Sequence, residues 1–113
     1  MKEFLFLYRT DYANMQHATK EQADAVMKKW MDWMGSIAAQ NKLTSKGERL
    51  HGSGKIVKAN DVVTNGPYTD IKESIGGYSL IKADSYDEAV EFAKGCPVLS
   101  TGGSVEIREI NAM

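Results

Sequence analysis

Residues 2–9 read KEFLFLYR, an alternation of aromatic and aliphatic side chains between charged ends. Successive side chains of an extended strand point to opposite faces, so the aromatic residues share one face and the leucines share the other. The two sets are Phe4, Phe6 and Tyr8, and Leu5 and Leu7. Both faces of this strand are apolar, and the fold must therefore cover both of them from water.

A long amphipathic helix is predicted to follow. Thr19 and Gln22 have the spacing of a capping box, in which each residue satisfies a free backbone N–H at the start of a helix. Apolar residues then recur every three or four positions and form one stripe. The stripe comprises Ala23, Val26, Met27, Trp30, Met34, Ile37 and Ala38. We expect this helix to cover one side of a sheet, with Trp33 at the edge of the stripe packing in the core.

The middle of the chain is predicted to be a polar connection and then a hairpin. Residues 42–53 are polar and contain two glycines, which disfavour a helix. Two short strands are predicted at 55–58 and 61–64, around a turn at Ala59-Asn60. The Asn-Gly-Pro run at 65–67 predicts a second turn, because Asn and Gly tolerate left-handed backbone angles and proline fixes its own φ.

The last third of the chain predicts a strand, a short helix and a final strand. In the first strand, 75–83 (IGGYSLIKA), the paired glycines indicate a bulge or a close approach of another backbone. Ser85 and Glu88 have the spacing of a second capping box, and a helix follows as far as the Gly and Pro at 95–97. In the final strand, 105–110, Val105 and Ile107 share one side, and Glu106 and Arg108 share the other.

This order predicts an α+β domain: a ferredoxin-like β-α-β repeat with an extra hairpin and with both helices on one face of the sheet. The second face is then uncovered, and it exposes either the aromatic side or the leucine side of the first strand. Contiguous apolar patches of this kind usually mark an interface. We therefore expect a second copy to stack its sheet there and form a homodimer.

Composition limits the classes of function. The chain has 113 residues, which favours a single domain over 1–113, and its 14 basic and 15 acidic side chains give a net charge of −1. Such a balance favours neither nucleic acid nor a membrane surface as a partner. The apolar run Phe4–Leu7 is too short for a signal-peptide core or a membrane span. Cys96 is the only cysteine, which excludes an intrachain disulfide and agrees with a cytoplasmic location.

One segment carries a family resemblance. Residues 65–73 read NGPYTDIKE and are followed by Gly76-Gly77-Tyr78. This resembles the signature of the YCII-related (DGPF-type) family, an Asp-Gly-Pro-Phe turn, acidic and Lys-Glu positions, and a Gly-Gly-Tyr that enters a strand. It departs from the pattern at Asn65, Tyr68 and Asp70, where the family has Asp, Phe and Glu. The resemblance implies a dimeric α/β barrel in which two ferredoxin-like sheets enclose clefts, and it implies no particular reaction.

Candidate site residues come from three places. The turn after the hairpin supplies Tyr68, Asp70 and Lys72. Its charges either form a solvated loop with local ion pairs or fold over the cleft, where Asp70 can accept a proton and Lys72 can bind an anion. Strands supply Tyr8, Tyr78 and Arg108 as ligand-binding residues, although Arg108 can instead pair with Glu106 or a partner carboxylate. His51, in the polar connection, is the candidate general acid or base, and the alternative is a loop histidine that bonds only to backbone or water.

Two functions fit these residues. In the first, the cleft is the active site for a small polar or anionic metabolite, with His51 or Asp70 transferring a proton and Arg108 and Lys72 holding the charge. In the second, the protein is a noncatalytic dimeric binding module that regulates or accompanies a protein partner, for example in transcription. Two separated histidines and one cysteine do not make a metal site, and no phosphate-binding glycine loop is present. We therefore expect no metal and no cofactor.

Overall fold

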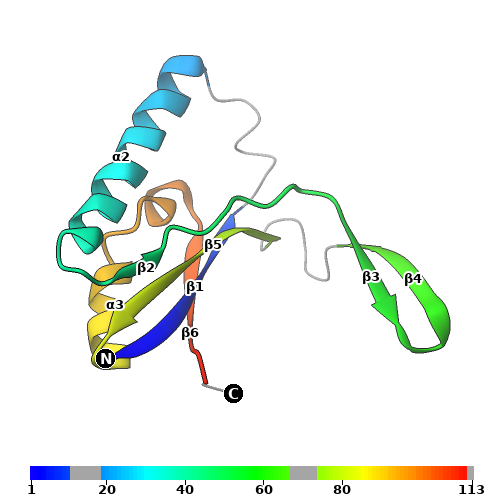
Figure 1. The fold of residues 1–113 in the computed structure, drawn as a ribbon. Coiled ribbons are helices and arrows are strands. Elements are labelled where there is room, and N and C mark those ends of the chain that lie inside the picture. The colour runs from blue at the N-terminus through cyan, green and yellow to red at the C-terminus, as the bar shows by residue number, and fades with distance from the viewer. Residues whose placement is uncertain (11–18, 67–73, 112–113) are drawn as a thin grey trace.

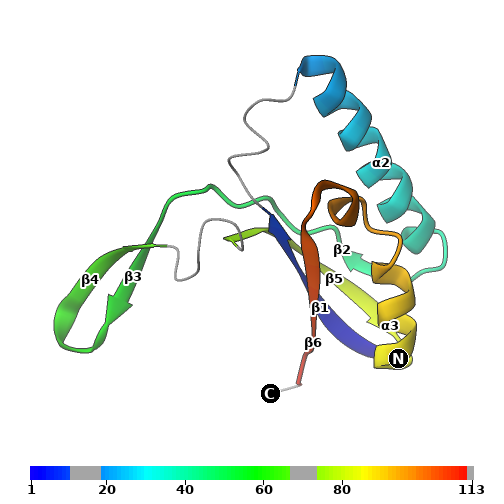
Figure 2. The ribbon, with the colours of Figure 1, turned by 180° about the vertical axis from the view of Figure 1, so that it is seen from behind.

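The structure is a computed structural model that describes residues 1–10, 19–66 and 74–111 (Figure 1). A four-stranded antiparallel sheet with the order β2-β5-β1-β6 forms one layer. Its strands are β1 (Lys2–Thr10), β2 (Leu43–Ser45), β5 (Ser74–Ala83) and β6 (Ser104–Glu109). The helices α2 (Lys20–Ala38) and α3 (Tyr86–Ala93) lie together on one side of this sheet, as the view from behind also shows (Figure 2). The predicted ferredoxin-like α+β fold is confirmed.

The edge strand that pairs with β5 is not the strand that we predicted for this sheet. We predicted residues 42–53 to be a connection, but Leu43–Ser45 pairs with β5, and Leu43 packs against the core. The predicted hairpin does form, as β3 (Gly54–Lys58) and β4 (Val62–Gly66), but it is a separate two-stranded sheet. β2 has three residues and one apolar side chain, so no periodicity marks it, and only its hydrogen bonds to β5 make it a strand.

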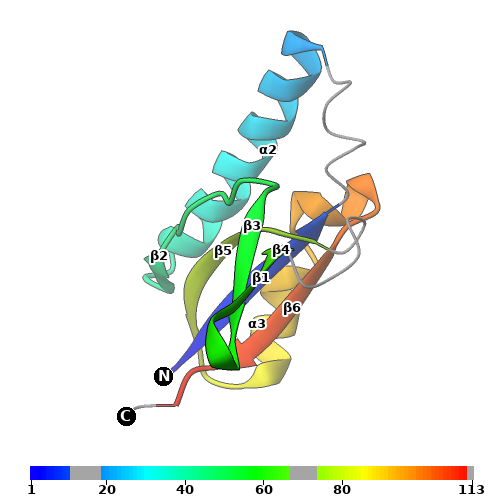
Figure 3. The ribbon, with the colours of Figure 1, turned by 90° about the vertical axis from the view of Figure 1, so that its right-hand side faces the viewer.

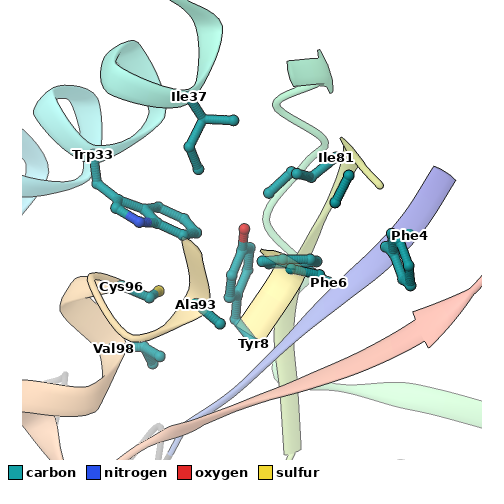
Figure 4. Packing of buried hydrophobic residues seen from close by; sticks show 11 residues of the cluster. Phe4, Phe6, Tyr8, Trp33, Ile37, Ile81, Ala93, Cys96 and Val98 are labelled. Atoms are coloured by element: carbon teal, nitrogen blue, oxygen red, sulfur yellow. The ribbon is translucent and has the colours of Figure 1, made fainter. Parts of the chain in front are cut away.

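The core lies between the sheet and the helices (Figure 4). Of the two alternatives for β1, the helices cover the aromatic side, and the leucine side faces away from them. Trp33 is buried and donates its indole N–H to the Phe92 carbonyl at 2.9 Å, so it packs in the core as expected. The buried apolar residues are Phe4, Phe6, Tyr8, Trp33, Ile37, Ile81, Ala83, Ala89, Ala93, Cys96 and Val98.

Only the C-terminal half of α2 covers the sheet. Trp33 and Ile37 are its buried residues, whereas Ala23 and Met27 of the predicted apolar stripe are exposed. A 19-residue helix is about 28 Å long, and α2 extends past the end of the sheet (Figure 1). The stripe was therefore read correctly as a helix, but it covers less of the sheet than its length suggests.

Both predicted helix starts are confirmed, one with a difference. Thr19 and Gln22 form the complete capping box at the start of α2. Ser85 accepts a hydrogen bond from the Glu88 backbone N–H, but the Glu88 carboxylate turns to the Asp84 backbone N–H and to Lys42. The Lys42 ammonium, 2.8 Å away, and the Asp84 N–H hold the pKa of Glu88 below its usual range. Glu88 thus ties α3 to the residue that precedes β2.

Two glycines let the connection from β2 run close to β5. Gly47 has a φ of +73°, and a Cβ there would overlap the Tyr78 carbonyl oxygen. A Cβ on Gly77 would lie 2.9 Å from the Glu48 carbonyl oxygen. The β1–β5 register also shifts beside Gly77, between Tyr8 and Arg9. The bulge and the close backbone approach predicted for the paired glycines are therefore both present.

We predict that Gly47→Ala destabilises the protein by several kcal/mol, because the added methyl group meets backbone and the φ is unfavourable for any other residue. Gly35→Ala is the matched control: Gly35 lies inside α2, and outside the adjacent helix backbone no atom is within 4 Å of its added Cβ. Alanine should stabilise that position by up to about 1 kcal/mol through its higher helix propensity. Thermal or urea unfolding measures both changes, and equal stability of the two variants would contradict the assignment of Gly47.

Candidate functional site

The sheet face opposite the helices is the candidate site, and we call it the open face. The β1–β5 register places Leu5 opposite Leu80 and Leu7 opposite Tyr78. On the other side of β1, Leu5 lies opposite Arg108 of β6. The leucines and Tyr78 are half-buried and Arg108 is exposed. The open face therefore presents an apolar strip with a tyrosine on one flank and an arginine on the other.

Two arginines share one carboxylate at the β6 side of this strip. Arg9 donates from Nε and Nη2 to Oε1 of Glu106, at 3.2 and 2.8 Å, and Arg108 donates from Nη1 to Oε2 at 3.4 Å. These hydrogen bonds, those from Arg9 most of all, lower the pKa of Glu106 from its usual value. Counted over these three side chains alone, the net charge is +1, and the interpretation that Arg108 pairs with Glu106 is confirmed.

Arg9 was missed at the sequence level. It shares the face of Leu5 and Leu7, because it follows them at alternate positions along β1. Nothing in the linear sequence places it beside Glu106, since 97 residues separate the two and only the β1–β6 register brings them together. The alternation alone predicts that Arg9 lies on the open face. Its ion pair with Glu106 could not be predicted, because it depends on how β1 and β6 pair in the fold.

Tyr8 does not lie with Tyr78 and Arg108. It points to the helix side of β1, where it is 6% exposed and packs edge-on against Trp30 and Trp33. Its hydroxyl is directed into this cluster (Figure 4) and has no hydrogen-bond partner among the described residues. Burial raises the pKa of the Tyr8 phenol far above its usual value, and the nearby Ser79 hydroxyl offsets part of that rise. A ligand on the open face would not contact Tyr8, so the three predicted strand residues do not form one site.

His51 lies just beyond a segment that extends the sheet edge. The Leu50 N–H donates to the Gly76 carbonyl at 2.8 Å, and the Tyr78 N–H donates to the Glu48 carbonyl at 3.1 Å. The Nδ1 atom of His51 accepts from the Ser53 backbone N–H at 3.1 Å, which requires a lone pair on Nδ1. The neutral ring then carries its proton on Nε2. His51 is exposed, so this Nε2–H can donate to a bound molecule.

Three predicted site residues, Tyr68, Asp70 and Lys72, lie outside the described residues. Within the described ranges, no group of three or more His, Cys, Asp or Glu side chains is arranged to hold a metal ion. Of the helices that the structure describes, none is long and apolar enough to cross a bilayer.

A shallow hollow of about 490 Å³ opens on the helix side, and it contains none of the predicted site residues. Its lining comprises Lys29, Asp32, Trp33, Gly95, Cys96, Pro97 and Ser100. Burial raises the pKa of the Cys96 thiol to about 12, so the thiol stays protonated and is a poor nucleophile. The Trp33 indole N–H is already bonded to Phe92. This hollow therefore offers little chemistry, and the open face is the stronger candidate.

Comparisons with known proteins identify the family. The family model of the YCII-related domain matches residues 4–113, while no curated protein matches the chain. Among solved structures, the chain is similar to the 5-chloro-2-hydroxyhydroquinone dehydrochlorinase TftG of Burkholderia phenoliruptrix in complex with 2,5-dihydroxybenzoquinone. The TM-score is 0.51 at 18% identity, and the match covers 98% of this chain and 95% of that one, a likeness of fold. The chain belongs to the YCII-related family.

Proposed function

We propose that this protein is a homodimer that binds a small anionic organic molecule at the open face. One observation carries the proposal: the open face joins the apolar strip of Leu5 and Leu7 to the cluster of Arg9, Glu106 and Arg108. An apolar surface beside a few convergent polar groups is the usual composition of a small-molecule site. The structural neighbour, the dehydrochlorinase, is in complex with a small oxygenated ring, which supports the same class of ligand here.

The dimer follows from the need to cover the open face. A second copy that stacks its own open face there would bury the leucines of both chains, and two sheets pack face to face at about 10 Å. Such an interface is isologous, with the same patch on both subunits. The space left between the sheets would be lined by Tyr78 and the arginine cluster of each subunit, which is where we place the ligand.

The arginine cluster has capacity for an anion. Arg108 is the more available of its two cations, because its side chain is 70% exposed and its hydrogen bond to Glu106, at 3.4 Å, is long. A guanidinium matches the geometry of a carboxylate and can hold it with two parallel hydrogen bonds. A carboxylate or phenolate group of the ligand would therefore bind Arg108, and its ring or chain would lie over the leucines.

Proton transfer by His51 is the catalytic part of the proposal. The protonated ring of His51 can act as a general acid from its exposed Nε2, and Asp70 remains the second candidate for proton transfer. Among the described residues no carboxylate contacts and orients His51. Ligand binding, in contrast, is supported by the contacts within the arginine cluster. If neither residue moves a proton, the protein acts as a dimeric binding module.

We predict that Leu7→Glu leaves a folded monomer, because it places two charges in the centre of the stacked faces. Met31→Glu is the matched control, since Met31 is 67% exposed on α2 and away from the open face. Light scattering at micromolar concentration should give twice the chain mass of 12.5 kDa for the native protein and the control. A native protein with the mass of one chain would contradict the dimer.

We predict that a ligand class found by thermal shift stabilises the native protein but not Arg108→Ala. The panel contains small organic acids, phenols and phosphorylated metabolites. A ligand at roughly a hundred times its dissociation constant adds about 2.7 kcal/mol, which moves the melting temperature of a domain of this size by several degrees. Lys94→Ala, which removes one exposed cation from the end of α3, should keep the shift. An equal shift in Arg108→Ala would remove Arg108 from the site.

We predict that His51→Ala and Asp70→Asn abolish turnover of the ligand identified in this way and leave the fold and the dimer intact. Turnover is followed by chromatography of the reaction mixture, and mass by light scattering. Loss of the dimer in these variants would assign both residues a structural role. Binding without turnover in the native protein would favour the noncatalytic module.

A further inference from the structure

β3 and β4 form a regular hairpin, which we call the arm. Val57 lies opposite Val63 and Ile56 opposite Thr64, and the pairing of Gly54 with Gly66 closes the base. Residues 59–61 join the strands with Asn60 and Asp61 at positive φ, a conformation that Asn and Asp tolerate better than other non-glycine residues. Lys55 also donates to the Asn65 side chain across the strands. The arm is thus locally well defined.

One face of the arm carries a pair of exposed apolar side chains. Val57 is 73% exposed and Val63 is 58% exposed, and the two lie directly opposite each other. On the other face, Ile56 leans against Gly66, where an added Cβ would lie 3.2 Å from the Ile56 Cγ1. Strand residues of high β propensity favour a half-buried pleated surface, and an isolated two-stranded hairpin is marginally stable in water. The valine pair therefore lacks the covering surface that such a strand favours, as far as the described residues show.

The arm stands on the same side of the sheet as the open face. Figures 1 and 3 show β3 and β4 on the side of the sheet that faces away from α2 and α3, with the arm in front of β1 and β5 in Figure 3. The arm shares no ladder with the four-stranded sheet, because its two strands pair with each other alone. We therefore expect a protein that stacks on the open face to contact the arm as well.

We propose that the arm of each protomer packs on the second copy through the Val57–Val63 pair and clasps it against the open face. This inference rests on the proposed homodimer and specifies a second contact within it. The occupant is a second copy because the arm borders the same apolar face that the second copy covers. By two-fold symmetry each chain gives one arm and receives one. Burial of valine side chains is favourable, so four such residues are a substantial part of a dimer interface.

Two measurements test the clasp. Val57→Thr/Val63→Thr keeps the shape and the strand preference of valine but adds hydroxyl groups to the proposed contact. Sedimentation should show at least a tenfold weaker dimer for this double variant. Val62→Thr, the same change on the opposite face of the arm, should alter the dissociation constant less than twofold. Hydrogen exchange should show slower exchange of the β3 and β4 amides at concentrations where the native protein is dimeric than after dilution to monomer.

The outcomes separate the clasp from the dimer itself. If the double variant dimerises as tightly as the native protein, the clasp is wrong and the open-face dimer stands. The same conclusion follows if the arm amides of the native protein exchange at the same rate in monomer and dimer. A native protein that is monomeric throughout overturns both. A double variant with an unchanged melting temperature as a monomer and a weakened dimer supports the clasp, because it excludes a loss of fold as the cause.

Discussion

The central strand β1 is apolar on both faces, and both helices lie on the same side of the sheet. The aromatic side is buried under α2 and α3, where Tyr8, Trp30 and Trp33 meet edge-on. Among the described residues, no helix lies on the leucine side. The sheet thus has one face that the helices cover and one face whose apolar side chains they leave partly exposed.

The electrostatics of the open face depend on Glu106. Its pKa is lowered by Arg9 and, to a smaller degree, by Arg108, so its pairing contributes to stability above the unfolded pKa and is lost as the pH falls through the folded value. The contribution is small, because the carboxylate is partly exposed and screened by water. The same protonation raises the charge of the cluster from one to two. Acid therefore weakens the ion pairs and leaves the two arginines of the cluster without their shared carboxylate charge.

Most of the fold was predictable because its elements have long patterns. The capping box at Thr19 and the alternation from Phe4 to Tyr8 identify α2 and β1, and the Gly-Gly pair identifies the bulge in β5. β2 was not predictable, because three residues are too few to show an alternation of apolar and polar side chains. Its pairing partners, Leu80 and Ile81, also lie far along the chain. The overestimate of helix cover has the same origin, because amphipathicity shows which side of α2 is apolar but not how far the sheet extends beneath it.

The site was predictable in part. Alternation places Tyr78 and Arg108 correctly on their strands, but it cannot say which side of β1 the helices choose, so Tyr8 was grouped with residues on the other face. The Arg9–Glu106 pair needs the register of two strands that are far apart in sequence. The roles of Tyr68, Asp70 and Lys72 remain predictions.

The pairing of Gly54 with Gly66 has a consequence for how this chain can change. The arm leaves and rejoins the rest of the chain through one narrow neck, and none of its side chains belongs to the buried cluster. Mutations in the arm can thus accumulate without weakening the core, and mutations in the core leave the shape of the arm alone. The residues of the arm and those of the buried cluster are therefore separate, so the sequence of the arm can change while the ferredoxin-like scaffold stays the same.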